Sequence, residues 1–148
     1  MRLRNLAAAG LLALTTVAGV GVGVGTAHAN PSCPDAYACL YSDAGFSGYK
    51  RTDFNSRSSW AAVTYDGTSI PLYRGDGVLT NVSSLDNWDK VKPIAVYYNS
   101  GWAGPCFTVA VFGQVSDFGG IVLPNGKSAN DNMNSHRFGY TCGAVYNF

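Results

Sequence analysis

The sequence predicts an all-β fold in a single domain stapled by disulfide bonds, and three observations support this. Apolar or aromatic runs of four to seven residues alternate with clusters of Gly, Asn, Asp and Ser, which is typical of short strands joined by tight turns. No long amphipathic helix is visible in the pattern. Four cysteines follow an export signal, and an even count there indicates two disulfides.

Residues 1–29 have the layout of a secretory signal peptide, which leaves a mature chain of residues 30–148. Arg2 and Arg4 precede an uncharged run, and Ala27-His28-Ala29 supplies a small-x-small cleavage site. A membrane anchor is the alternative, because the run nearly reaches spanning length. Its abundant glycine and the lack of a basic cluster after it favour the signal peptide. We therefore expect a secreted, extracellular protein that has no membrane association after cleavage.

The expected elements follow one another along the chain as short segments. The predicted strands are 38–41, 49–54, 69–73, 94–98, 106–112, 120–123 and 143–148. Residues 56–65, SRSSWAAVTY, suit one or two helical turns, because serines at their start would cap them. Turn signals such as DAG, GDG and PNGK separate the strands.

An aromatic–glycine turn occurs twice, as YSDAGFSG at 41–48 and as YYNSGWAG at 97–104, 56 positions later. A serine-containing segment follows each copy, TNVSSLDN at 80–87 and NDNMNSHRF at 130–138. The glycines permit positive φ, and the leading tyrosine would cover the turn with its ring. Since the turn holds no nucleophile, general base or cation, we interpret it as a fold element used twice.

Four cysteines, Cys33, Cys39, Cys106 and Cys142, allow three disulfide connectivities. We favour Cys33–Cys39 with Cys106–Cys142, because each pair would hold one end of the chain. Loop-closure entropy assigns about 2–2.5 kcal/mol to the short loop and about 4 kcal/mol to the long one. A zinc knuckle is not expected, because no CxxC pair is present.

Composition argues against a nucleic-acid partner and against common enzymes. The mature chain carries 8 basic and 9 acidic residues and has no basic stripe. It holds a single histidine, His136, no glutamate and no G-x-S-x-G context. Its aspartates lie in turn-like contexts, and oxidised cysteines are not nucleophiles. We expect a protein that is not an enzyme and requires no cofactor, with His136 in a surface or capping role.

The duplicated turn carries a family resemblance. Tyrosine, four residues, an aromatic, any residue and glycine, with a later Ser-Ser corner, resembles the Greek-key motif of the βγ-crystallins. Two copies preceded by CPDAYACLYSD (33–43) are similar to microbial βγ-crystallin-like proteins, which include the streptomycete-type metalloproteinase inhibitor. The resemblance covers nearly all of 33–148. It implies a sandwich of two Greek-key motifs, repeat one at about 37–90 and repeat two at about 91–148.

The resemblance also implies a calcium site in the second copy. Microbial members often bind calcium through Asn/Asp-Asn/Asp-x-x-Ser/Thr-Ser, a spacing that gathers oxygen ligands on a tight loop. Asn130, Asp131 and Ser135 fit this pattern, Asn134 replaces its first hydroxyl residue, and Asp43 of the first turn is a further candidate ligand. The alternative is local turn chemistry, in which these side chains bond nearby backbone.

The first copy keeps the serine corner but lacks the oxygen-rich arm of such a site. Ser83 and Ser84 fit the corner, whereas Leu79 and Thr80 occupy the two positions where acidic or amide residues belong. We therefore expect this half to have lost its calcium site.

Three functions remain open. The resemblance implies a secreted, monomeric inhibitor of an extracellular metalloprotease of the thermolysin type. A calcium-binding crystallin-like structural exoprotein is the second hypothesis. The third is a killer-toxin-like or cell-wall-binding module, in which exposed aromatic rings would stack on sugars. For this role Trp60 and Trp88 lie in polar stretches and are expected to be exposed, whereas Trp102 is expected in the core.

An inhibitor needs a loop that is held rigidly for the protease cleft, so that little entropy is lost on binding. A thermolysin-type cleft is expected to favour a bulky apolar residue just after the scissile bond. Two segments offer one: Cys106-Phe107, where the disulfide would hold the cut ends together, and 69–73 with Ile70. For both segments the alternative is that the apolar residues belong to the strand core.

Overall fold

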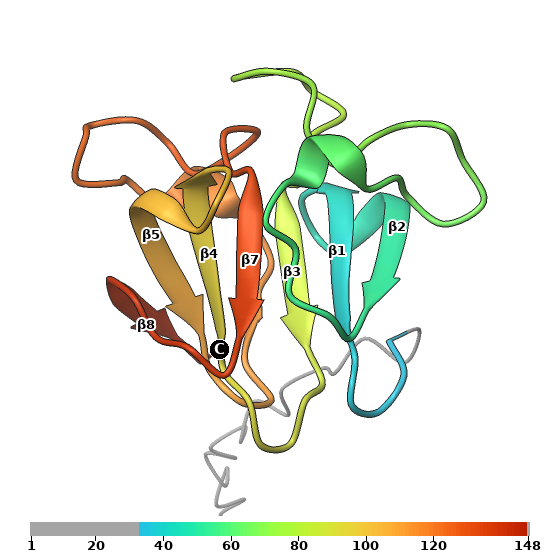
Figure 1. Cartoon of the computed structure of the whole chain (residues 1–148), viewed down its shortest axis with the longest axis vertical. Coiled ribbons are helices and arrows are strands. Elements are labelled where there is room, and N and C mark those ends of the chain that lie inside the picture. Colours follow the sequence, from blue (N-terminus) through green and yellow to red (C-terminus); the bar gives the residue numbers. More distant parts are fainter. Residues whose placement is uncertain (1–32, 148) are drawn as a thin grey trace, which may run out of the picture.

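The computed structural model describes residues 33–147, which fold into two four-stranded β-sheets (Figure 1). The first sheet has the strand order β2-β1-β3-β6, and the second has the order β7-β4-β5-β8. Every pairing is antiparallel except that of β5 with β8. The all-β prediction is confirmed, whereas the predicted signal peptide lies outside the described residues. Within 33–147 no helix has the length and apolar character of a membrane span.

The elements have the following bounds along the chain: β1 (Ala38–Asp43), β2 (Ser47–Asp53), η1 (Trp60–Ala62), β3 (Ser84–Asn87), β4 (Ile94–Asn99), β5 (Ala103–Val109), β6 (Gln114–Val115), η2 (Phe118–Gly120), β7 (Ser135–Phe138) and β8 (Ala144–Tyr146). The single turn η1 lies inside the segment predicted to make one or two helical turns. The long connections β2–β3 and β6–β7 gather at the upper end in Figure 1, and the β3–β4 connection lies at the lower end.

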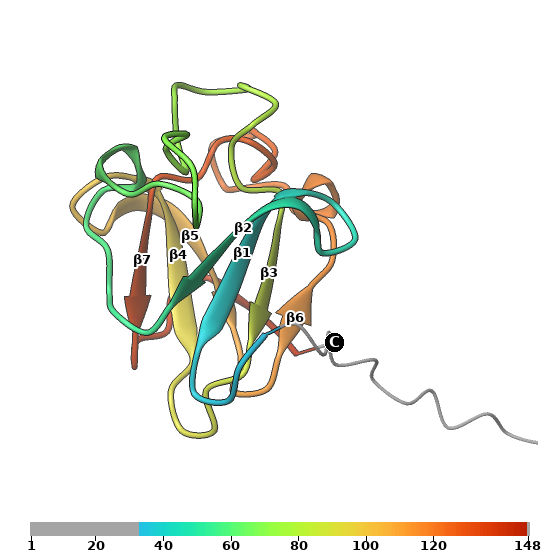
Figure 2. The same ribbon diagram turned by 90° about the vertical axis from the view of Figure 1, so that its right-hand side faces the viewer.

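Each half of the chain contributes backbone to the sheet of the other half. The strand β6 follows β5 in sequence but pairs with β3 through Leu85↔Val115, as Figure 2 shows. In the other direction, Arg57 of the first half pairs with His136 of β7 through two N–H···O bonds of 2.9 and 3.0 Å. The halves are therefore interlocked and share one hydrophobic core.

Alternation along the strands builds this core. In β1, Ala38 and Leu40 point into the main core, whereas Cys39 and Tyr41 belong to a second cluster on the opposite face of the sheet. The second sheet contributes Ile94 and Val96 of β4 and further residues of β5.

The two aromatic–glycine turns adopt the same backbone conformation. Positive φ angles recur at positions 56 apart: 71° at Gly45 and 73° at Gly101, 58° at Phe46 and 57° at Trp102, and 76° at Gly48 and 77° at Gly104. Glycine is required at position 48, because a Cβ there would lie 2.3 Å from the Ser42 hydroxyl oxygen. The interpretation of the repeat as a fold element used twice is confirmed.

Serines of the following segments close both turns. The Ser84 hydroxyl donates to the Asp43 carbonyl at 2.7 Å, and the Ser135 hydroxyl donates to the Asn99 carbonyl at 2.6 Å. In the first turn the Tyr41 ring also meets Phe46 edge-on, with 5.9 Å between centroids. These bonds attach each turn to a strand about 40 residues later in the chain.

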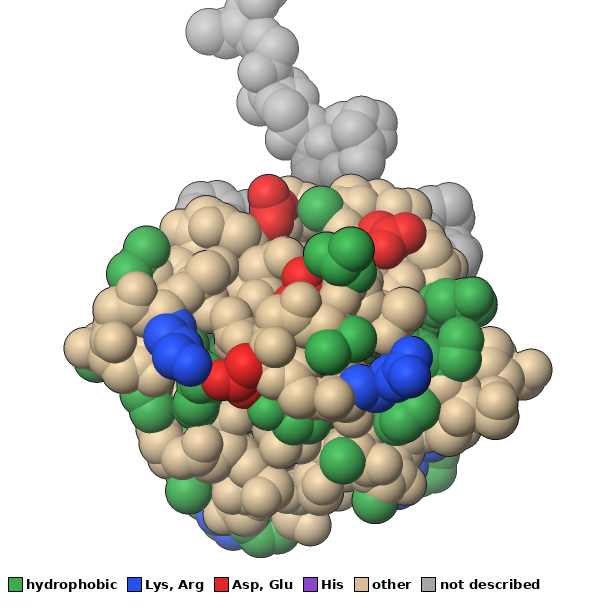
Figure 3. Space-filling view, turned by 90° about the horizontal axis from the view of Figure 1, so that it is seen from above, with side chains coloured by type: hydrophobic (Ala, Val, Ile, Leu, Met, Phe, Trp, Pro, Cys, Tyr) green, Lys and Arg blue, Asp and Glu red, His purple; other side chains and the backbone are tan. Residues whose placement is uncertain are grey.

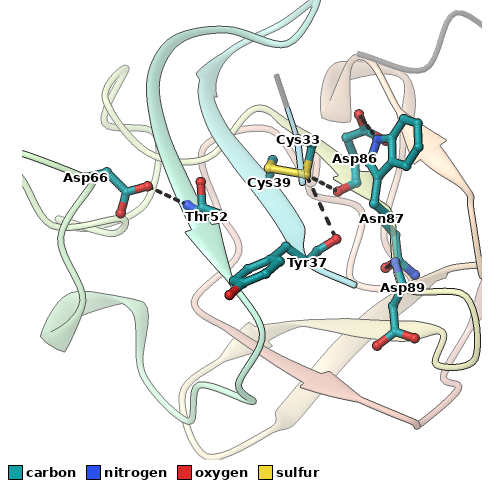
Figure 4. The surroundings of a disulfide bond; sticks show 9 residues. Cys33, Tyr37, Cys39, Thr52, Asp66, Asp86, Asn87 and Asp89 are labelled. Atoms are coloured by element: carbon teal, nitrogen blue, oxygen red, sulfur yellow. Dashed lines mark hydrogen bonds between the residues drawn. A yellow bond between two sulfur atoms is a disulfide. The ribbon is translucent and has the colours of Figure 1, made fainter. Parts of the chain in front are cut away.

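Both disulfides have the favoured connectivity, Cys33–Cys39 and Cys106–Cys142. Figure 4 shows the first, where Cys33 Sγ lies 3.9 Å from the carbonyl oxygens of Tyr37 and Asp86. The bond therefore fixes the N-terminal segment against β1 and β3. The second joins β5 to the segment between β7 and β8.

Two of the predicted strands are wrong, and three strands, β3, β6 and β7, were not predicted. Residues 69–73 form an irregular arm that pairs with 63–65 through Tyr65 N–H to Ile70 O (3.0 Å) and Leu72 N–H to Val63 O (2.8 Å). Pro71 lacks an N–H and limits this pairing to a bridge. Gly120 instead ends the 3₁₀ turn η2, and residues 121–123 contribute an isolated bridge between Val122 and Ser128. The strands β3 (SLDN) and β7 (SHRF) were missed because they are short and mostly polar, and β6 (QV) because it has only two residues.

The expected surface or capping role of His136 is also wrong, because the side chain is fully buried. Its Nδ1 accepts the indole N–H of Trp60 at 2.8 Å, so its Nε2 carries the proton and donates to the Asn55 carbonyl at 2.8 Å. Burial of the ring lowers the pKa of His136 to about 4, and the nearby Asp53 carboxylate opposes the shift.

This pKa predicts a loss of stability on mild acidification. The unfolded chain takes up a proton near pH 6.5 and the folded chain only near pH 4, so stability is complete above 6.5 and falls as the pH decreases from 6.5 to 4. Urea unfolding of residues 30–148 should show about 2 kcal/mol less stability at pH 5 than at pH 7. His136→Gln should lower stability but remove this slope. An unchanged midpoint in wild type between pH 7 and 5 would contradict the assignment.

Candidate functional site

The two halves meet at the buried side chain of Asp131, whose backbone has a positive φ of 60°. One carboxylate oxygen accepts the Ser83 hydroxyl at 2.9 Å, and the other accepts the Asn130 amide N–H at 2.8 Å. Ser83 belongs to the serine corner of the first half and Asp131 to the motif of the second. The strand exchange therefore combines residues from both copies into one oxygen-rich cluster.

The electrostatics of this cluster favour an added positive charge. Burial raises the pKa of Asp131 above its ordinary value, the like charge of Asp43 raises it further, and the Ser83 hydrogen bond opposes both. The side-chain oxygen of Asn130 is buried and has no hydrogen-bond partner. Since unpaired buried oxygens and neighbouring carboxylates are costly, a hard cation bound here would stabilise the cluster.

Two of the predicted calcium ligands have other partners. The Ser135 hydroxyl closes the second turn, and the Asn134 side-chain oxygen accepts the Trp60 backbone N–H at 3.2 Å. The sequence did not predict that Ser83 lies next to Asp131. It showed Ser83 as the fifth residue of the first motif, but not that the first motif packs against the second. Among residues 33–147 no three His, Cys, Asp or Glu side chains converge, so a cation here would need amide, hydroxyl or carbonyl oxygens as well.

The two predicted inhibitory segments are poorly placed to enter a cleft. Phe107 is 1% exposed and packs edge-on against Phe118, with 5.0 Å between ring centroids, and against Tyr146 at 5.8 Å. The hypothesis that Phe107 is presented to a protease is therefore inconsistent with the structure, because β5 directs the ring into the core. Ile70 is half-buried and packs on the same core.

The tryptophans also differ from expectation. Trp60 is fully buried beside His136, so its predicted exposure is wrong. Trp102 is 37% exposed and not in the core; the Arg137 guanidinium lies 4.8 Å from its ring centroid, and its indole N–H donates to the His136 carbonyl at 3.1 Å. Trp88 is half-buried and donates its indole N–H to Asp86 at 2.9 Å. These three rings form no shared platform for sugars.

Comparison with known proteins places this geometry in a family. The model of peptidase inhibitor family I36 matches residues 26–109, more than half of the chain. No curated protein matches the sequence significantly. A solved structure from work on the evolution of the eye lens βγ-crystallin domain fold superposes with a TM-score of 0.53 at 18% identity, covering 75% of this chain and 92% of that chain. A βγ-crystallin from Ciona intestinalis gives 0.44 at 17% identity, covering 68% and 96%. The first likeness confirms the βγ-crystallin-like fold.

The burial of Phe107 leads to a prediction about stability. Phe107→Ala should lower the free energy of unfolding by about 3–5 kcal/mol, because it opens a cavity between Phe118 and Tyr146. Phe112→Ala is the matched control, since Phe112 is 54% exposed and should change stability by less than about 1 kcal/mol. Equal, small effects in chemical unfolding would show that position 107 is not core.

Proposed function

Because the chain belongs to peptidase inhibitor family I36, we propose that it inhibits metallopeptidases of the thermolysin type outside the cell, as a monomer. The family match carries this proposal: it spans the Cys33–Cys39 opening, the first turn and its serine corner, and the strands β4 and β5. Membership in this family makes the protein a non-enzymatic protease inhibitor. The class of peptidase and the monomeric state go beyond the family match and are part of the proposal.

The architecture supports an inhibitory role. Interlocked halves, two disulfides and two turns closed by serines leave little freedom in the connections between strands. A connection that is already ordered loses little conformational entropy when a protease binds it. We expect such a scaffold to be cleaved slowly as well, because proteolysis proceeds from a locally opened state.

The direct test is a titration of thermolysin with the oxidised mature protein, residues 30–148, at constant calcium concentration. We expect activity to fall in proportion to added protein with a 1:1 endpoint and a nanomolar inhibition constant. Size-exclusion chromatography should show a single complex of one inhibitor and one enzyme. A trypsin-type serine peptidase is the control and should keep its activity. Full thermolysin activity at micromolar concentrations of intact protein would contradict the proposal.

Calcium binding is a second candidate function, and the cluster around Asp131 favours it. Calcium prefers oxygen ligands, and the cluster offers the Asp131 carboxylate, the partnerless oxygen of Asn130 and the Ser83 hydroxyl. The negative charge of Asp43 nearby would further attract the ion. They come from both halves, so a bound ion would add one more connection between them.

Calcium should therefore raise the thermal stability of the metal-free protein. With a dissociation constant of about 0.1 mM, 10 mM calcium would add about 2.7 kcal/mol and raise Tm by several degrees. Asp131→Asn should abolish the increase. Asp35→Asn is the control, because Asp35 is exposed and pairs only with Lys90 among the ion pairs that the structure describes. Identical Tm values with and without calcium, and no heat in calorimetry, would contradict this function.

A further inference from the structure

We propose that the protease-binding segment is the 74–81 loop, residues Arg74–Asn81 (RGDGVLTN), and that Leu79 is its main contact residue. This inference rests on the proposed function and identifies where it acts. The loop is the light-green segment at the top of Figure 1. Its sequence holds the turn signal GDG and, at Leu79 and Thr80, the arm that lacks calcium ligands, but neither pattern predicts a contact with a protease.

The side chain of Leu79 does not belong to the hydrophobic core. Its side chain is 81% exposed, the highest value among the exposed large hydrophobic residues of 33–147. Full burial of a leucine side chain contributes about 1.5–3 kcal/mol to folding, and here nearly all of that is absent. Thr80, next to it, is half-buried, so the chain turns Leu79 outward while its neighbour faces the protein.

The base of the loop is closed by the side chain of Asn81, which is fully buried. Its oxygen accepts the Arg74 backbone N–H at 2.8 Å, and its amide donates to the carbonyl oxygens of Gly75 at 2.6 Å and Asp131 at 2.7 Å. One side chain thus ties the start of the loop to its end and both to the second half of the protein. The Asn81 N–H also donates to Val78 O at 2.8 Å, which fixes the tip.

The flank of the loop is fixed by Asp76. Its carboxylate accepts the hydroxyls of Tyr73, at 2.6 Å, and of Tyr98 in β4, and it forms an ion pair of 2.9 Å with Lys127. These hydrogen bonds lower the pKa of Asp76 to about 2, so the carboxylate stays ionised at neutral pH. The Gly77 N–H adds a bond of 3.0 Å to the Asp131 carbonyl. Both sides of the Val78–Leu79 peptide bond are therefore attached to the body of the protein.

This arrangement suits a peptidase with a deep apolar pocket. Figure 3 looks down on this end of the molecule, where hydrophobic side chains are scattered among polar and charged ones and do not form one continuous patch. A partner that needs a broad apolar face would find none here, whereas one that receives a single projecting side chain would gain most of its binding energy from it. A thermolysin-type cleft is expected to take a bulky apolar residue after the scissile bond, and Leu79 presents one on an ordered backbone.

The test compares inhibition constants for thermolysin among three proteins: wild type, Leu79→Ala and Val91→Ala. Val91 is the matched control, because it is 79% exposed in the β3–β4 connection at the opposite end of the molecule. Leu79→Ala should raise the inhibition constant at least about 30-fold, the effect that defines a binding hot spot. Val91→Ala should change it less than about twofold. Both residues are exposed, so Tm should remain within about 2 °C of wild type in each variant.

A second measurement locates the contact without mutation. Hydrogen exchange of the wild-type complex should show new protection in 74–81 and none in 88–93. Inhibition by wild type with an unchanged constant for Leu79→Ala, or with protection elsewhere, would overturn the inference and leave the proposed function intact. A wild-type protein that does not inhibit would contradict the proposed function, and the inference with it.

Discussion

The exchange of backbone between the two halves is the constraint on which the remaining structure depends. Pairing of β6 with β3, and of Arg57 with His136, closes both sheets with residues from the opposite half. The core between the sheets is consequently made from residues that are far apart in sequence. The same crossing brings Ser83 to Asp131 and Trp60 to His136, contacts that span 48 and 76 positions. Topology, rather than any single side chain, assembles both the core and the oxygen-rich cluster.

The parts of this fold that can be read from the sequence are those with local signals. Glycine and aromatic residues 56 positions apart predicted two identical turns, because positive φ is needed at particular offsets. The disulfide pairing was one of three that the sequence allowed, and Ser135 was expected to bind calcium although it closes the second turn. By contrast, the burial of His136 depends on an indole that comes from a loop of the other half. The hydrophobicity of Phe107 indicated a role in packing or in binding, but not that its side chain points into the core.

The two copies have diverged in a complementary way. In the second copy, Asn130 and Asp131 keep the oxygen-bearing side chains of the motif. In the first copy the corresponding positions hold Leu79 and Thr80, and the chain there projects outward. The arm that lacks oxygens is supported by the arm that keeps them, because the Asp131 carbonyl accepts hydrogen bonds from Asn81 and Gly77. A duplicated turn unit can thus take a structural role in one copy and present a side chain in the other.

Within residues 33–147 each disulfide stays inside one half, so the β3–β4 connection is the one covalent link between the halves, and Val91 within it is highly exposed. Because the exchanged strands and the common core cross this junction, a single backbone cut there would not release either half. The two fragments would remain associated, and the β2–β3 and β6–β7 connections at the other end of the molecule would keep their contacts. A protein that meets peptidases would in this way stay assembled after a cut in the β3–β4 connection, held together by the interlocked strands rather than by the continuity of its chain.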